Sequence, residues 1–251
     1  MSGFDVRLLD RFSVRADGRL VALPTACQRL ITMVALGPRG AEVSVIRSVL
    51  WCGLAPSARA ARLRAAMWRV RRECPGLLTS RAGRVGLAQT ARVDLHRAVD
   101  LAAAVLRDER GRASDGAVTS TLGWLEEDLL PDWCEPWLEP HQRSYRELRL
   151  RALERLAQRL PGQGLSAYAI EAALHVIRDD PYRESAHQLL IAAHISEGNA
   201  AEALQHFQAL RRTLREDLGV EPALPSPGPA GLRLALAASP RCHRSPARRG
   251  R

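Results

Sequence analysis

Alternating apolar and polar positions open the chain and predict short β-strands over residues 4–23. Phe4, Val6 and Leu8 alternate with polar neighbours, and Asp17-Gly18 is a dipeptide typical of hairpin turns. A small sheet is therefore expected at the start of the chain.

The apolar spacing then changes to a helical period. Thr25 and Gln28 form a capping-box pattern that predicts a helix start, and Gly37-Pro38 predicts its end. A second short helix is expected after Ser44, ending at Trp51.

Residues 57–74 predict a third helix, because they contain no Gly or Pro and many alanines, and Ser57 is a candidate N-cap. One apolar stripe follows the helical period, formed by Leu63, Met67, Val70 and Cys74. Six arginines occupy other positions and only Glu73 opposes them. A cationic helix of this kind fits the major groove of DNA, although a solvated surface is the alternative interpretation.

Two extended runs, 77–80 and 84–88, flank Ala82-Gly83 and predict a hairpin with Arg81 and Arg84 near its tip. The order of sheet, helix, helix, turn, helix and hairpin predicts a winged helix-turn-helix, whose third helix enters the major groove. The residues predicted to contact double-stranded DNA are Arg59, Arg62, Arg64, Arg69, Arg71, Arg72, Arg81 and Arg84.

Charge divides the chain into three parts. Residues 1–97 contain 17 arginines and 6 acidic residues, whereas residues 98–221 contain 14 arginines and 21 acidic residues. We therefore predict a DNA-binding domain over 1–97 and a second domain with different partners over 98–221. The Pro- and Arg-rich residues 222–251 are expected to form a disordered tail.

Residues 98–221 show helical spacing and a 34-residue period, the length of a tetratricopeptide repeat. Gly164 corresponds to Gly198 and Ala169 to Ala203, and Pro181 takes the closing position of a repeat. Such stacks offer a surface to protein partners, and the alternative is a purely structural packing role. The predicted helices are 94–107, 118–127, 139–160, 164–179, 182–197 and 200–218.

Three tryptophans lie among five acidic residues in the stretch 124–138. Trp124, Trp133 and Trp137 are interpreted as core anchors where the two domains meet, with a docking site for another protein as the alternative.

Enzyme chemistry has no recognisable pattern in the sequence. The five Cys are far apart, and among the seven His only His187 and His194 share a spacing that could hold a ligand. No phosphate loop, GxSxG or HExxH is present. We therefore predict a non-enzyme without catalytic residues, cofactor or metal. Because no leader and no 18-residue apolar run is visible, we expect no membrane association and a cytoplasmic, nucleoid-associated protein.

The motifs resemble a known group of bacterial regulators. Residues 1–97 are similar to the OmpR/PhoB-like winged helix, and Leu63-Arg-Ala-Ala-Met-Trp-Arg-Val-Arg-Arg72 is similar to the SARP group of antibiotic-pathway activators. The stretch 124–138 and Asp217-Leu-Gly-Val-Glu-Pro222 resemble the entry and exit of that group's bacterial transcriptional activation domain (BTAD).

The resemblance implies an activator of specialised-metabolite genes that binds promoter repeats as a homodimer and contacts RNA polymerase. It places the groove-facing positions at Arg62, Ala65, Ala66, Trp68, Arg69 and Arg71. The alternative function is a tetratricopeptide-type adaptor whose basic domain binds an acidic protein. The predicted fold class is mainly α with a small β component, an N-terminal winged helix followed by an all-α helical repeat.

Overall fold

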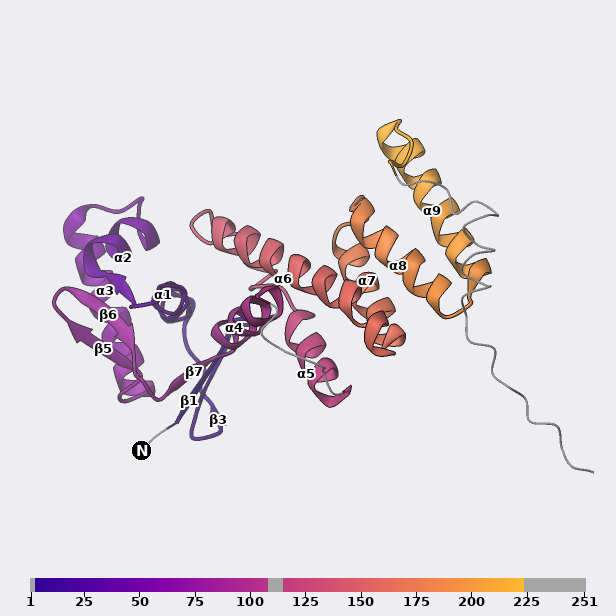
Figure 1. Cartoon of the computed structure of the whole chain (residues 1–251). Coiled ribbons are helices and arrows are strands. Elements are labelled where there is room, and N and C mark those ends of the chain that lie inside the picture. The colour runs from indigo at the N-terminus through magenta and orange to yellow at the C-terminus, as the bar shows by residue number, and fades with distance from the viewer. Residues whose placement is uncertain (1–2, 108–114, 224–251) are drawn as a thin grey trace, which may run out of the picture. The chain divides into compact units, whose positions relative to one another are not determined.

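The computed structural model describes residues 3–107 and 115–223 (Figure 1). The chain divides into two compact units. Unit 1 consists of Met1–Ala103 and Gly123–Arg149, and unit 2 of Ala104–Leu122 and Leu150–Arg251. Unit 1 thus includes the predicted DNA-binding domain together with a later segment of the chain. From residue 224 on, the predicted disordered tail lies outside the described residues.

Unit 1 contains two small sheets. The first has the strand order β3-β2-β1-β7, in which β1 pairs antiparallel with β2 and parallel with β7, and Val6 lies opposite both Val14 and Val93. The second has the order β4-β6-β5. The strands are β1 (Phe4–Arg7), β2 (Ser13–Ala16), β3 (Arg19–Leu20), β4 (Ala41–Glu42), β5 (Leu78–Arg81), β6 (Arg84–Leu87) and β7 (Ala91–Val93).

Three helices of unit 1, which lie between β3 and β5 in the sequence, pack on one another. They are α1 (Thr25–Leu36), α2 (Val43–Leu50) and α3 (Pro56–Glu73). Each of the three contacts the other two, and α1 also contacts β6 while α3 contacts β5. Leu30, Ile31 and Ile46 are fully buried in the core, so the helices gain most of their stability from apolar packing.

The helices begin at different residues from those predicted by capping patterns. Thr25 is the first residue of α1 after an extended Pro24, and the amide of Gln28 donates to the Leu23 carbonyl, so no capping box forms. Helix α2 begins at Val43, before Ser44. Helix α3 begins at Pro56 rather than after Ser57, since proline is favoured in the first helical turn.

The segment 123–149 returns to unit 1 and packs against its core. The backbone N–H of Leu130 donates to the Leu8 carbonyl at 3.0 Å, and the rings of Phe12 and Trp133 stack with centroids 6.0 Å apart. Trp124 and Trp137 are also half-buried against this core, which agrees with the core interpretation of the tryptophans.

Six further α-helices and one 3₁₀-helix complete the described part of the chain. Unit 2 contains η1 (Pro161–Gln163), α7 (Ser166–Asp179), α8 (Glu184–Ser196) and α9 (Ala200–Leu218), while α4 (Asp94–Leu106), α5 (Asp115–Leu125) and α6 (Glu139–Arg159) have residues in both units.

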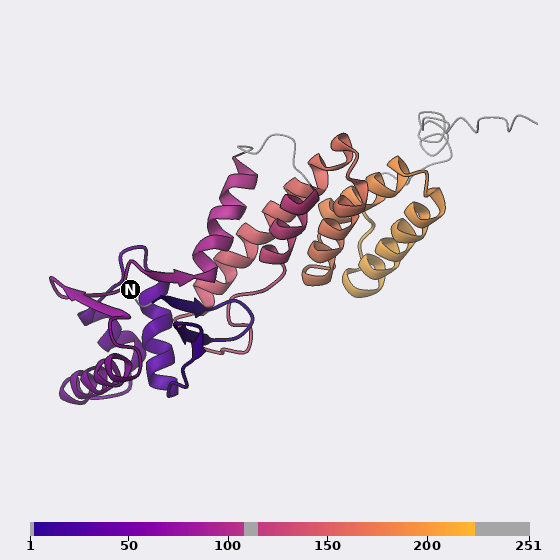
Figure 2. The same cartoon turned by 90° about the horizontal axis from the view of Figure 1, so that it is seen from below.

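Helix α7 packs on α8 and α8 on α9, and Figure 2 shows these three side by side. Gly164 and Gly198, 34 residues apart, both adopt left-handed backbone angles, and Ala169 and Ala203 are both fully buried. The predicted fold class, a winged helix with a small β component and a tetratricopeptide-like helical repeat, is confirmed. Among the described residues, none of the helices combines the length and apolar character of a membrane span.

Candidate nucleic-acid interface

Helix α3 is fixed on unit 1 by one apolar face. Leu63, Ala66 and Val70 are buried, and the helix contacts both α1 and α2. Alanine and arginine are strong helix formers, so the remaining positions can be charged without loss of helicity. The buried face therefore determines which side chains of α3 point away from the protein.

The arginines of α3 surround its outward face. At 3.6 residues per turn, Trp68 and Arg72 project about 160° from the mean direction of the buried residues. Arg62 and Arg69 lie about 75–95° from that direction on one side, and Arg64 and Arg71 lie about 105–125° from it on the other. These arginines and Trp68 are exposed.

The exposed arginines differ in what they contact within unit 1. The Nε atom of Arg69 lies 3.3 Å from a carboxylate oxygen of Glu73, one turn further along the helix. The guanidinium of Arg72 lies over the ring of Trp68, with Cζ 5.4 Å from the ring centroid. A surface ion pair of this kind contributes little to stability, so an anionic ligand can compete for the guanidinium of Arg69.

The hairpin formed by β5 and β6 lies beside α3. Ala82 and Gly83 both have positive φ, as a tight two-residue hairpin turn requires. Arg81 is exposed and pairs across the strands with Arg84. The hairpin therefore places a second cationic element near the exposed face of the helix.

Two of the eight predicted arginines have their side chains directed to backbone groups of unit 1. The guanidinium of Arg59 donates to the carbonyls of Leu54 and Cys52, at 2.6 and 2.7 Å, in the turn before α3. Arg84 donates to the carbonyl of Gly40 at 3.0 Å and to a carboxylate oxygen of Glu42 at 2.9 Å. Both side chains are thus held against the protein by hydrogen bonds, while their predicted contact with DNA stays a prediction.

Ala66 does not face outward, contrary to the position implied by the resemblance. It is only 5 % exposed, and its carbonyl accepts a hydrogen bond from the Cys27 thiol at 3.7 Å. Ala66 lies on the same side of the helix as Leu63 and Val70. The buried face of α3 therefore runs through Ala66, whereas the sequence predicted an apolar stripe through Met67.

Two buried cysteines lie in the unit 1 core, Cys27 on α1 and Cys74 at the end of α3. Burial raises the pKa of both thiols, and the charge of nearby Glu73 raises it further, while the charge of Arg69 partly offsets the rise at Cys27. The two thiols therefore stay neutral near pH 7, so they add no negative charge beneath the arginines.

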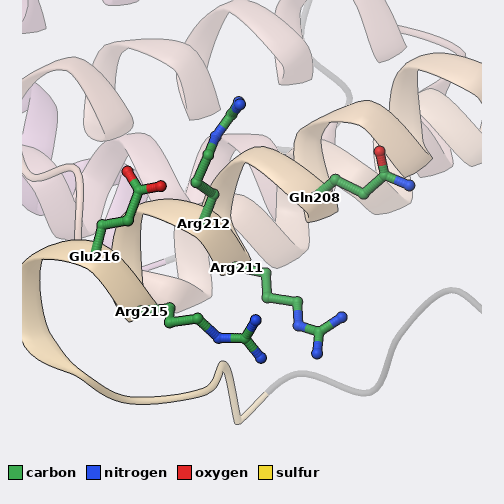
Figure 3. A pocket seen from close by; sticks show the side chains of 5 residues that line it. All are labelled: Gln208, Arg211, Arg212, Arg215 and Glu216. Carbon is green, nitrogen blue, oxygen red and sulfur yellow. The ribbon is translucent and has the colours of Figure 1, made fainter.

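A second basic cluster lies on α9 of unit 2, where an open groove of about 380 Å³ is present (Figure 3). Two of its arginines, Arg211 and Arg215, donate to the carboxylate of Glu221 through their Nε atoms at 2.8 and 2.9 Å. These hydrogen bonds lower the pKa of Glu221, so the carboxylate is charged and neutralises part of the cluster. The groove is lined by Gln208, Arg211, Arg212, Arg215 and Glu216.

Comparison with known proteins identifies a matching family, a protein of similar sequence and a solved structure of similar fold. The sequence model described as "Bacterial transcriptional activator domain" matches residues 79–225. The chain is 30 % identical over 218 residues to the regulatory protein AfsR of Streptomyces coelicolor, covering 82 % of this chain and 22 % of AfsR. It thus spans about a fifth of that relative's length.

Among solved structures, Mycobacterium tuberculosis EmbR, determined in complex with a low-affinity phosphopeptide, has a similar fold. The match has a TM-score of 0.67 and 21 % sequence identity, and it covers 94 % of this chain and 65 % of the EmbR chain. At this level of identity the likeness concerns the fold alone.

Proposed function

Because the chain belongs to the family that contains the bacterial transcriptional activator domain, we propose that it is a sequence-specific DNA-binding transcription activator. Helix α3 enters the major groove of promoter DNA, and the β5–β6 hairpin reaches an adjacent groove or its phosphates. The observation that supports this proposal best is the distribution of exposed arginines over the sides and the outward face of α3, away from the buried face.

The chemistry of this face suits duplex DNA. Arginines that neutralise phosphates release condensed counterions, which provides affinity without regard to sequence. A guanidinium can also donate two hydrogen bonds to O6 and N7 of guanine in the major groove. Arg62 and Arg69 lie on one edge of the outward face and are the candidates for this role, while Arg64, Arg71 and Arg81 are candidates for phosphate contacts.

The helical repeat of unit 2 has a different role in this proposal. Its region of the sequence, residues 98–221, has more acidic residues than arginines, so it does not compete for DNA. We assign it to dimerisation on direct promoter repeats or to contact with RNA polymerase, since stacked helix pairs present extended surfaces to proteins. The regulator acts on the chromosome in the cytoplasm, and its targets are specialised-metabolite genes.

The test measures binding of the full chain to fluorescent duplexes by anisotropy, with duplexes enriched from a random pool. Arg69→Ala should weaken binding to the enriched duplex by roughly 5- to 150-fold, the effect of losing a base contact. Arg178→Ala serves as the matched control, because it removes an exposed arginine from α7 of unit 2. Equal losses for the two variants would contradict the proposal. Binding of an acidic protein without binding of any duplex would also contradict the proposal, because that is the result expected of an adaptor.

A further inference from the structure

Trp68 differs from the other tryptophans of the chain in being exposed. Trp51, Trp124, Trp133 and Trp137 all pack against the unit 1 core, whereas the side chain of Trp68 is 58 % exposed on the outward face of α3. A large aromatic ring exposed to water contributes little to folding and offers apolar surface to a ligand. Folding of unit 1 therefore does not explain Trp68.

The surroundings of Trp68 leave the ring accessible from outside. Ala61 and Ala65 precede it by two turns and by one turn on the same side of the helix, and both are exposed. Their small side chains allow α3 to approach the floor of a groove closely. Arg72, one turn later, holds its guanidinium over the ring, with Cζ 5.4 Å from the centroid.

The major groove offers few groups that an apolar ring can contact favourably. Base edges there present hydrogen-bond donors and acceptors, with the exception of the C5 methyl group of thymine. Contact between an indole ring and this methyl removes apolar surface from water on both sides. An indole over guanine or adenine would instead leave acceptors without donors, apart from the single N–H of the ring.

We infer that Trp68 is a specificity-determining residue that selects thymine in the bound DNA by contact with its C5 methyl group. Arg72, held over the ring, is positioned to contact the nucleotide beside that thymine. This inference rests on the proposed DNA-binding function, and it deepens that function by naming the base that the centre of α3 reads.

The experiment removes the methyl group alone. In a duplex enriched by the full chain from a random pool, each thymine is replaced in turn by uracil, which keeps every hydrogen-bonding group. Affinity is then measured by fluorescence anisotropy for the wild type and for Trp68→Ala and Trp68→Gln. At least one replacement should weaken wild-type binding by about fourfold, the effect of one lost methyl contact. The same replacement should not change the affinity of either Trp68 variant for the duplex.

A matched control is Leu174→Ala, which removes an exposed apolar side chain from α7 and should retain the wild-type dependence on the methyl group. The two Trp68 variants keep a good helix former at an exposed position, and circular dichroism verifies their folding.

Two results would overturn the inference while leaving the proposed function standing. In the first, no uracil replacement changes the affinity of the wild type. In the second, a uracil replacement weakens binding by Trp68→Ala and Trp68→Gln as much as it weakens binding by the wild type. If the folded full chain retains no duplex at all, the proposed function fails as well.

Discussion

Arg71 and Ser80 are joined by a hydrogen bond of 2.8 Å, from the guanidinium of Arg71 on α3 to the hydroxyl oxygen of Ser80 on β5. This bond connects the helix to the hairpin directly. Both residues are exposed, and the sequence gives no pattern that pairs them. The bond restricts where the Arg71 guanidinium can lie, which matters if that group contacts a phosphate between the helix and the hairpin.

A double-mutant cycle on Arg71→Ala and Ser80→Ala tests this connection. Each substitution should weaken binding to duplex DNA, and the two effects should fall short of additivity by about 0.5–1 kcal/mol, the net contribution of one hydrogen bond. Anisotropy at fixed salt concentration measures the cycle. Strict additivity would show that the hydrogen bond does not position Arg71 for DNA.

Arg59 and Arg62 should give opposite results although they are three residues apart on α3. Arg59→Ala removes two hydrogen bonds to backbone carbonyls, so the free energy of unfolding in urea should fall by about 1–2 kcal/mol. Arg62→Ala should leave stability within about 0.5 kcal/mol of the wild type. It should instead lower the slope of log affinity against log salt by about one. A loss of stability in Arg62→Ala would contradict this division of roles.

Gly40 allows the close approach of the β4 loop to β6. A Cβ atom at this position would lie 2.1 Å from the Val85 carbonyl oxygen, and its φ is +72°. Gly40→Ala should therefore destabilise unit 1 by more than about 2 kcal/mol and weaken DNA binding through displacement of the hairpin. Gly53→Ala is the matched control, because a Cβ there meets no atom within 4 Å. Urea unfolding compares the two, and similar midpoints would contradict the prediction.

Because of two histidines in unit 2, we expect a lower free energy of unfolding in mild acid. Burial lowers the pKa of His187 and His206 below the usual 6.5, and the charges of His194 and His187 lower that of His206 further. Below about pH 6.5 the unfolded chain thus binds more protons than the folded chain. The free energy of unfolding should rise with pH through this range and level off above it.

Urea unfolding from pH 5 to 7.5 measures this dependence. His206→Gln should flatten it, whereas His141→Gln, an exposed position on α6, should leave it as in the wild type. If the free energy of unfolding of the wild type fell as pH rises through this range, the lowered pKa values of the two histidines would be contradicted.

Local patterns were sufficient to predict most of the fold. The hairpin turn at Asp17-Gly18 forms with two positive φ angles, and the glycines at 164 and 198 mark equivalent turns of the helical repeat. The matched family confirms the resemblance inferred from the sequence. These features could be predicted because each depends on residues close together in the chain or on a fixed period.

Helix starts and contacts between distant residues could not be predicted in the same way. Residue 55 precedes a proline and is extended, so α3 begins at Pro56 without a side-chain cap. The contacts of Arg84 involve residues 39–42, more than forty positions earlier, and only the folded chain brings them together. Eight similar arginines in the sequence thus divide into groups with different structural surroundings.

Sequence-specific binding of DNA by α3 is tested most directly by the affinity of the full chain for an enriched duplex and for a random duplex, measured across a series of salt concentrations. If α3 reads promoter DNA, affinity should fall linearly on logarithmic axes as salt rises, and the enriched duplex should bind at least about 10³-fold more tightly than the random one. Equal affinity for the two duplexes at every salt concentration, or no binding to either, would contradict sequence-specific binding by α3.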